Sequence, residues 1–460
     1  MSNGWWIMQE VADLSFETTA QPRQWTPLGM NAYQWTVFIA AWLGWGFDIF
    51  DALLFNYVAP NCVPALLHLP FGSPQAKSAT LWWTGLLSSI LLIGWATGGV
   101  VFGKVADRIG RTRTLLITML LYSIGTALCA FAPNIWVLMI CRIISSLGIG
   151  GEWAAGASMV AEVVPEKRRV EAGALLSTAS PVGLFLATVV TYQITGVYFR
   201  DPSTSWRYVF LFGLVPAAIA FMVRLFVREP ERWKQLDGNV RPRIRELFSS
   251  RYLRFTISGS SMAVIALITW WSCNAFVPLV AKGLAQHAAL QMQYLEAGAI
   301  EELGQKWIRT ATTCFNLGGI IGALLTIPAA KLLGRKKMFL VYFAFSAVAI
   351  IMAFGTNLDP HTRLLMYFPI GLATQGVFGC FSFYLPELYP TRLRATGAGF
   401  TFNIGRVIAA GGPLLVGSIA ASGATVDSSM RVLLWIAVVP VVGILLLPLV
   451  IETSESILSE

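Results

Sequence analysis

Charged residues are scarce in this chain. They make up 12% of its 460 residues, whereas 56% of the residues are hydrophobic. A soluble domain carries about 25% charged residues, so this composition argues against a soluble fold. Only three histidines are present, and the six cysteines are scattered without a CxxC pair. We therefore expect buried thiols rather than disulfides, and neither a metal nor a cofactor.

Signals of several other protein classes are also missing. No GxxxxGK[ST] loop occurs, which argues against transport driven by ATP, and no catalytic constellation indicates an enzyme. The net charge of +9 does not indicate binding to nucleic acid, because the basic residues lie in short loops between apolar runs. The first thirty residues are polar and rich in tryptophan, so we expect no cleavable signal peptide.

Long apolar runs are abundant. A helix needs about 20 apolar residues to cross a bilayer, so the runs predict an all-α membrane protein. Twelve spans are predicted, at 33–58, 81–105, 113–132, 134–160, 170–194, 206–227, 255–281, 309–332, 337–356, 363–385, 394–421 and 431–451. Residues 1–32 would form an N-terminal segment, 33–227 a first bundle, 228–254 a linker, 255–451 a second bundle and 452–460 a tail.

The distribution of lysine and arginine predicts the orientation of these spans. Most basic residues fall in loops that lie on the same side as the N-terminus, including 104–113, 167–169, 224–254 and 331–337. This bias places both termini in the cytoplasm, in a multi-pass protein of the plasma (inner) membrane. Within the linker, residues 241–248 predict an amphipathic helix on the inner leaflet, and the outer loop 283–308 predicts a short surface helix.

Two motifs occur twice in the chain. Glu162-x-x-Pro165, followed by basic residues, returns 225 residues later at Glu387, and Gly110-Arg111 returns at Gly334-Arg335. Two matches in the same order, at nearly the same distance, predict two related halves.

These motifs resemble those of the major facilitator superfamily. The resemblance rests on GKVADRIGRTR at 103–113, its weaker copy at 331–337, the E-x-x-P-x-x-x-R repeat, the twelve spans and the basic linker. It implies two pseudo-symmetric six-helix bundles, function as a monomer, and gating roles for Asp107, Arg108, Arg111, Glu162, Arg168, Glu387 and Arg392. Lys331 stands where the second copy would carry an acid, so we expect that gate to be weaker or differently built.

Ionisable residues inside predicted spans are the candidates for proton coupling. They are Asp48, Asp51, Arg142 and Glu152. A charge at the centre of a membrane helix costs about 2.5–3.5 kcal/mol on insertion scales, which makes each residue a functional hypothesis. The two aspartates lie three residues apart, on one helix face, where double ionisation is disfavoured. In the structural alternatives, the arginine caps backbone groups and one aspartate caps an interrupted helix.

Arg406 is the candidate anchor for a substrate anion. It lies in a run rich in glycine and alanine, and a guanidinium matches a carboxylate with two hydrogen bonds. The alternative is that it serves as a charge partner for the acids of other spans. The sequence from 384 to 406 resembles the sialate and organic-acid:proton symporter branches of the superfamily.

Other residues are predicted to complete the pocket. They are Asn403, Trp153, Tyr192, Asn274, Gln375 and Tyr384, with Trp270 and Trp271, although an aromatic side chain in a span serves packing more often than binding. Ser180-Pro181 predicts a helix kink.

The predicted function is symport of protons with a small organic anion, such as a mono- or sugar carboxylate, by alternating access. The first alternative is a sugar or polyol proton symporter, which would not need Arg406. A protein that binds solute without moving it is the second.

Overall fold

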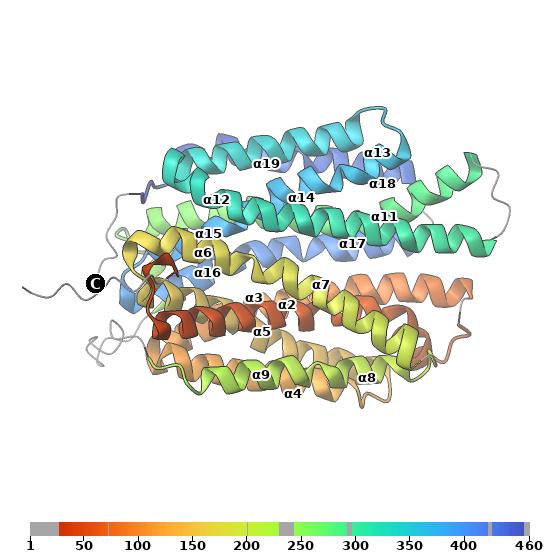
Figure 1. The fold of residues 1–460 in the computed structure, drawn as a ribbon, viewed down its shortest axis with the longest axis horizontal. Coiled ribbons are helices and arrows are strands. Elements are labelled where there is room, and N and C mark those ends of the chain that lie inside the picture. Colours follow the sequence, from red (N-terminus) through yellow and green to blue (C-terminus); the bar gives the residue numbers. More distant parts are fainter. Residues whose placement is uncertain are drawn as a thin grey trace, which may run out of the picture.

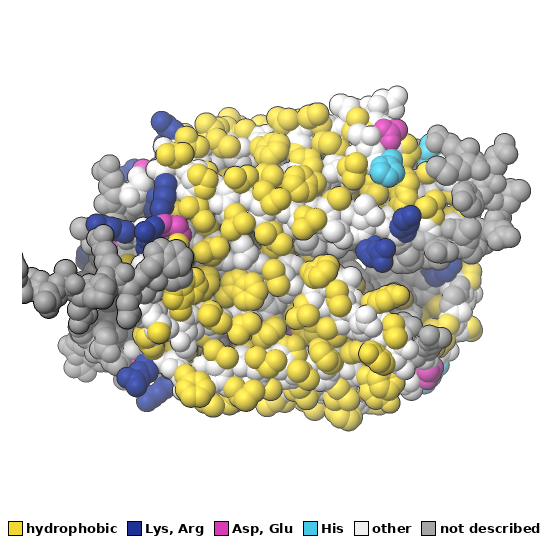
Figure 2. Space-filling model, viewed as in Figure 1, with side chains coloured by type: hydrophobic (Ala, Val, Ile, Leu, Met, Phe, Trp, Pro, Cys, Tyr) yellow, Lys and Arg dark blue, Asp and Glu magenta, His cyan; other side chains and the backbone are white. Residues whose placement is uncertain are grey.

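The computed structural model describes residues 27–71, 73–199, 201–229, 243–291, 297–421 and 426–454. Every regular element in these residues is a helix, and the helices run side by side along the long axis of the molecule (Figure 1). Hydrophobic side chains cover the middle of the surface, while lysine and arginine gather toward the two ends (Figure 2). Such a belt is what a bilayer requires, so the prediction of an all-α membrane protein is confirmed.

The first half of the chain forms six spans. They are α2 (Ala32–Leu67), α3 (Pro74–Ile109), α4 (Arg111–Cys129), α5 (Ile135–Val163), α6 (Arg169–Ser177) with α7 (Ala179–Tyr192), and α8 (Ser205–Phe212) with α9 (Leu214–Arg224). Side-chain caps fix several starts, as when Asn31 accepts a hydrogen bond from the backbone N–H of Gln34.

The second half repeats this arrangement. It comprises α11 (Leu253–Gln291), α12 (Ala297–Gly355), α13 (Pro360–Leu365), α14 (Tyr367–Gly376) and α15 (Phe378–Glu387), then α16 (Arg394–Ala409), α17 (Gly411–Ala421), α18 (Val426–Ile436) and α19 (Val438–Leu445). Within α12 the backbone leaves the helical region at Gly334, with φ 76°, and the chain turns back on itself (Figure 1). Among the described residues, α11 contributes one span, α12 two, α13–α15 one, and the pairs α16–α17 and α18–α19 one each, so the two halves together provide twelve.

Prolines explain all but one of the breaks that divide five of the spans into two or more helices; the break at 377 has no proline three residues after it. One-residue breaks at 178, 213, 366, 410 and 437 each lie three residues before a proline, at 181, 216, 369, 413 and 440. A proline has no N–H for the carbonyl four residues earlier, and its ring crowds that carbonyl. The breaks are therefore bends within a span, and the kink predicted at Ser180-Pro181 is confirmed.

Two predicted boundaries were too short. The helix α2 continues past residue 58 to Leu67 and ends at His68 in the left-handed conformation, and α11 continues to Gln291. The surface helix predicted within 283–308 is wrong, because the described parts of that range are the ends of α11 and α12. Hydropathy marks only the apolar part of a helix, whereas alanine and glutamine extend it beyond the lipid.

The linker also differs from its prediction. Of residues 241–248, the structure describes a short 3₁₀ helix, η4 (Ile244–Phe248), in which Leu247 is buried. Phe248 contacts Phe400 edge-on, with ring centroids 5.3 Å apart. The prediction of an amphipathic helix on the membrane is therefore wrong for this part, which is a short 3₁₀ helix with Leu247 buried in the protein. The ranges 230–242, 1–26 and 455–460, where the other linker and terminal predictions fall, lie outside the described residues.

The two halves meet along pairs of equivalent helices. The helix α3 packs on α16 and α17, and α6 packs on α15 and α12. The contact between α3 and α17 needs glycine, since a Cβ added at Gly85 would lie 2.7 Å from the carbonyl oxygen of Pro413. The groups described next lie along this seam between the halves.

Candidate gating network and substrate cavity

The first copy of the repeated motif forms a tight turn between α3 and α4. Gly110 permits this turn, with φ 107°. Beyond it, the Glu229 carboxylate accepts hydrogen bonds from the backbone N–H groups of Arg111 (2.8 Å), Thr112 (3.0 Å) and Arg113 (3.2 Å). This carboxylate satisfies the free donors at the start of α4 and lies at the positive end of its dipole.

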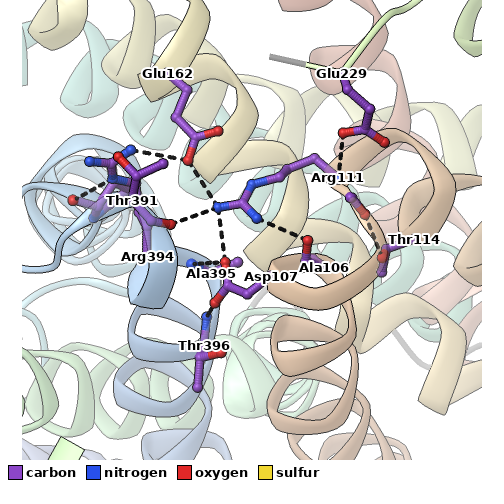
Figure 3. A network of polar contacts seen from close by, with 12 residues as sticks. Ala106, Asp107, Arg111, Thr114, Glu162, Glu229, Thr391, Arg394, Ala395 and Thr396 are labelled. Atoms are coloured by element: carbon purple, nitrogen blue, oxygen red, sulfur yellow. Dashed lines mark hydrogen bonds and ion pairs between the residues drawn. The ribbon is translucent and has the colours of Figure 1, made fainter. Parts of the chain in front are cut away.

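Arg111 is the centre of a buried ion network at this turn (Figure 3). Its guanidinium pairs with Asp107 at 2.9 Å and with Glu162 at 3.0 Å, and it donates to the backbone oxygen of Thr391 at 3.0 Å. Arg394, from the second half, donates to the same Glu162 oxygen at 3.0 Å. All four charged side chains are buried, so the network joins the two halves in a place shielded from water.

Asp107 adds a second link between the halves. Its carboxylate accepts hydrogen bonds from the backbone N–H groups of Ala395 (3.3 Å) and Thr396 (2.7 Å), which lie at the start of α16 (Figure 3). An acid from the first half therefore caps a helix of the second half. We refer to the end of the molecule that holds residues 104–113 and 331–337 as the motif end.

The second copy builds a matching network at the motif end. Arg335 donates to Glu387 at 3.0 Å, and Arg169 of the first half lies 3.6 Å from the same carboxylate. Glu452 accepts from the backbone N–H groups of Arg335 (2.9 Å) and Lys336 (3.0 Å), as Glu229 does in the first copy. Burial raises the pKa of Glu452, but these donors outweigh burial and hold it below its ordinary value.

Lys331 makes the second copy chemically different from the first. It takes the place of Asp107 and pairs with Glu171 of α6 at 2.5 Å. Glu171, which also accepts from Arg168 at 2.9 Å, stands 225 residues before Thr396, the partner of Asp107. Both copies therefore keep a contact between the halves at this position, but the acid Asp107 of the first copy is replaced by the base Lys331 in the second. The second copy is differently built, as expected.

The register of the repeat identifies arginines that the sequence analysis missed. Arg169 and Arg394, each seven residues after its glutamate, face the acids of the network. The predicted Arg168 and Arg392 bind Glu171 and Glu246 beside it, and the side chain of Arg108 is exposed. Equal spacing from Glu162 and Glu387 is the sequence signal that selects the pair of arginines facing the network.

A small cavity lies between the halves, away from this network. Four polar, six aromatic and three aliphatic residues line it: Arg406, Gln375, Ser177, Ser180; Trp45, Trp95, Trp270, Trp271, Phe378, Phe402; Ile49, Leu53, Leu267. Its free space holds about two water molecules. The residues come from α2, α3, α6 and α7 of the first half and α11, α14, α15, α16 of the second.

Arg406 is the cationic residue of this lining. Its guanidinium carbon lies 4.2 Å from the ring centroid of Trp95 and 4.6 Å from that of Phe402, and it donates to the side-chain oxygen of Asn403. Asp48 lies close enough for its charge to act on the guanidinium. The side chain is 4% exposed, and its Nε finds no acceptor among the described residues.

Gln375 connects the halves across the cavity. Its amide oxygen accepts the indole N–H of Trp270, and its amide nitrogen donates to the hydroxyl of Ser180 at 3.3 Å. The predicted residues Arg406, Gln375, Trp270 and Trp271 therefore meet at one cavity, together with the kink beside Ser180.

Other predicted pocket residues lie elsewhere. Trp153 stacks on Phe402 at 4.0 Å, outside the lining. Tyr192 is 65% exposed at the end of α7, and Tyr384 is buried with its hydroxyl 2.7 Å from that of Ser258. Asn274 is half-buried and does not line the cavity.

The two aspartates of α2 have different surroundings. Asp51 accepts a hydrogen bond from Thr126 of α4 at 2.5 Å, while Asp48 lies near Arg406. Arg142 donates to the backbone oxygens of Asp51 (3.2 Å) and Ala52 (2.6 Å), the structural role considered as its alternative. Glu152 is buried in α5.

Comparison with known proteins agrees with this architecture. A model of the Major Facilitator Superfamily matches residues 41–413. A putative metabolite transport protein of Haemophilus influenzae is 30% identical over 85% of this chain and 90% of its own length. A probable 4-methylmuconolactone transporter of Cupriavidus pinatubonensis is 27% identical (89% and 90%), and a sialic acid transporter of Escherichia coli is 24% identical (84% and 87%).

Among solved structures, the proton:xylose symporter XylE superimposes with a TM-score of 0.70 at 18% identity, over 93% of this chain and 98% of that one. At this identity the likeness shows the fold alone. The family match covers most of the chain, and the relatives are multi-pass transporters rather than enzymes. This chain, with its paired six-helix bundles and its duplicated network at the motif end, belongs to the major facilitator superfamily of membrane transporters.

Proposed function

We propose that this transporter takes up a small organic anion together with a proton. The observation that carries the proposal is Arg406, a buried guanidinium that lines the cavity between the halves and has an Nε without an acceptor among the described residues. A carboxylate would bind such a group with two charge-assisted hydrogen bonds. The relatives named for sialic acid and for 4-methylmuconolactone support an organic acid as the substrate class.

Asp48 supplies the coupling to protons in this proposal. In this structure its charge acts on Arg406. When a substrate carboxylate binds the guanidinium of Arg406, it neutralises the positive charge that stabilises the Asp48 carboxylate. Protonation of Asp48 then removes the excess negative charge from the low-dielectric interior. One anion then enters with one proton, a neutral pair that uses the pH gradient and not the membrane potential.

The network at the motif end would act as the gate. We infer that the motif end is cytoplasmic, because it gathers the basic loops 104–113 and 331–337. In this proposal, the ion pairs of Glu162 with Arg111 and with Arg394 hold that end closed. The cavity is too small here for a substrate, and it would widen as the opposite end opens.

The test is uptake into proteoliposomes. Labelled lactate, benzoate, sialate and gluconate, with glucose as a control, are compared with and without an inward proton gradient. We expect accumulation of an acid that collapses with a protonophore. Arg406→Gln should lower kcat/KM about 100-fold, since two hydrogen bonds to a charged group are lost. Arg254→Gln, which removes an exposed arginine outside the motif turns, should leave uptake unchanged.

A second variant tests the coupling. Asp48→Asn should lose accumulation driven by the proton gradient but keep exchange of labelled for unlabelled substrate, because Arg406 remains. Glucose uptake that is insensitive to Arg406→Gln would instead favour the sugar symporter, the alternative that does not need Arg406. Saturable binding without accumulation would favour a receptor-like protein.

A further inference from the structure

We propose, on the basis of the proposed function, that the transported anion is an aromatic carboxylate whose flat ring lies among the tryptophans while its carboxylate binds Arg406. The inference starts from the lining of the cavity, in which six of thirteen residues are aromatic. Trp45 and Trp95 come from the first half, and Trp270, Phe378 and Phe402 come from the second. Once the cavity has widened, a flat ring bound among these side chains would contact aromatic residues from both halves at once.

The geometry of Arg406 fits the carboxylate of such a molecule. The rings of Trp95 and Phe402, 4.2 Å and 4.6 Å from the guanidinium carbon, pack against the guanidinium. A guanidinium held on its faces presents its N–H groups at its edge, in the plane that matches a carboxylate. An aromatic acid is planar through its ring and carboxylate, so its ring would extend from this edge toward the neighbouring side chains.

The hydrogen-bond acceptors of the lining are already engaged, whereas the indole N–H of Trp95 is a donor without an acceptor among the described residues. The Gln375 amide is bonded to Trp270 and to Ser180. The hydroxyl of Ser177 lies 3.1 Å from the backbone oxygen of Phe378 and 3.0 Å from the hydroxyl of Ser382. A sugar acid would bring several hydroxyls into a lining with few free acceptors for their protons, and each buried hydroxyl proton left unpaired weakens binding. The lining therefore disfavours a polyhydroxylated acid and favours an apolar ring.

The experiment compares two acids that share a carboxylate and a six-carbon ring. Benzoate is flat and aromatic, whereas cyclohexanecarboxylate is puckered and saturated. In proteoliposomes that hold the full chain, we expect benzoate to have a kcat/KM about tenfold higher or more, because stacking on aromatic faces adds to the burial of area. Gluconate should not compete with benzoate at equal concentration.

Two leucine substitutions identify the cause of this preference. Phe378→Leu removes a ring from the lining, and we expect it to reduce the preference for benzoate over cyclohexanecarboxylate to about threefold or less. Phe315→Leu is the matched control, because Phe315 is buried and packs near Trp270, with centroids 6.4 Å apart, as Phe378 does at 6.0 Å, but Phe315 does not line the cavity. It should keep the full preference.

The outcomes separate this inference from the proposed function. If both ring acids and gluconate are taken up equally well in a manner that depends on Arg406, the aromatic inference is overturned and anion symport stands. If no acid is taken up, or uptake ignores Arg406, both fail. A preference for benzoate that Phe315→Leu removes as fully as Phe378→Leu does would also overturn the assignment of the ring to this cavity.

Discussion

The ion pair between Lys331 and Glu171 at the motif end leads to a quantitative prediction. Lys331 pairs with Glu171, whereas the equivalent Asp107 accepts hydrogen bonds from the backbone at the start of α16. Lys331→Asp places an acid opposite Glu171 and should open the motif end. The double variant Lys331→Asp, Glu171→Thr recreates the arrangement of the first copy, with Thr396 as the model for position 171. It should close that end again.

The expected size follows from the exposure of the pair. The side chain of Lys331 is 42% exposed and that of Glu171 is 7% exposed, so their attraction contributes about 1 kcal/mol. Lys331→Asp removes this attraction and adds a repulsion of similar size, together about 2 kcal/mol. The open form of the motif end should therefore rise about 30-fold relative to the closed form. High salt should reduce the effect, since the pair is partly exposed to solvent.

Ser382→Cys provides the assay. Ser382 is buried, with its hydroxyl 3.0 Å from that of Ser177 across the halves, so a cysteine there reacts with a maleimide only when α6 and α15 separate. Lys337→Asp, which makes the same charge change at an exposed position, is the control and should not alter the labelling rate. The reasoning is refuted if Lys331→Asp labels no faster than this control, or if Glu171→Thr fails to reverse its effect.

Further variants test the buried charges. Glu162→Gln leaves two buried arginines without their carboxylate, which should destabilise the closed motif end by about 3–5 kcal/mol. Maleimide labelling at position 382 should therefore rise by more than in Lys331→Asp, and equal labelling in the two variants would contradict this. Arg142→Leu removes the donors to two carbonyls of α2 and a positive charge near Asp51, and should lower the Tm in detergent, with partial recovery when Asp51→Leu is added. The pKa of Glu452 is lower in the folded protein than its unfolded value of 4.5. The ionised carboxylate therefore stabilises the fold at a pH above 4.5, and this stabilisation is lost as the pH falls through the folded pKa. Glu452→Gln should therefore lower the Tm at pH 7 and have little effect at a pH below that folded value.

The sequence predicts the spans well because a bilayer demands long apolar runs. Its failures have physical causes. The linker segment around Leu247 has an amphipathic pattern, but Leu247 is buried within the protein and Phe248 contacts Phe400. Tyr192 was assigned to the pocket by residue type, whereas the depth and direction of a side chain in the bilayer decide whether it reaches the cavity. Periodicity along one helix does not reveal either property.

The sequence contains enough information to predict the network at the motif end, although the sequence analysis missed Arg169 and Arg394. The same offset that relates Glu162 to Glu387 relates Arg169 to Arg394, and Glu171 to Thr396. Asp107 contacts Thr396 from the opposite half, so Lys331, its counterpart, must meet whatever stands at 171. The lysine at position 331 therefore predicts an acid at position 171, and Glu171 is present. In a duplicated fold, an unexpected charge in one copy therefore predicts its partner at the equivalent position of the other half.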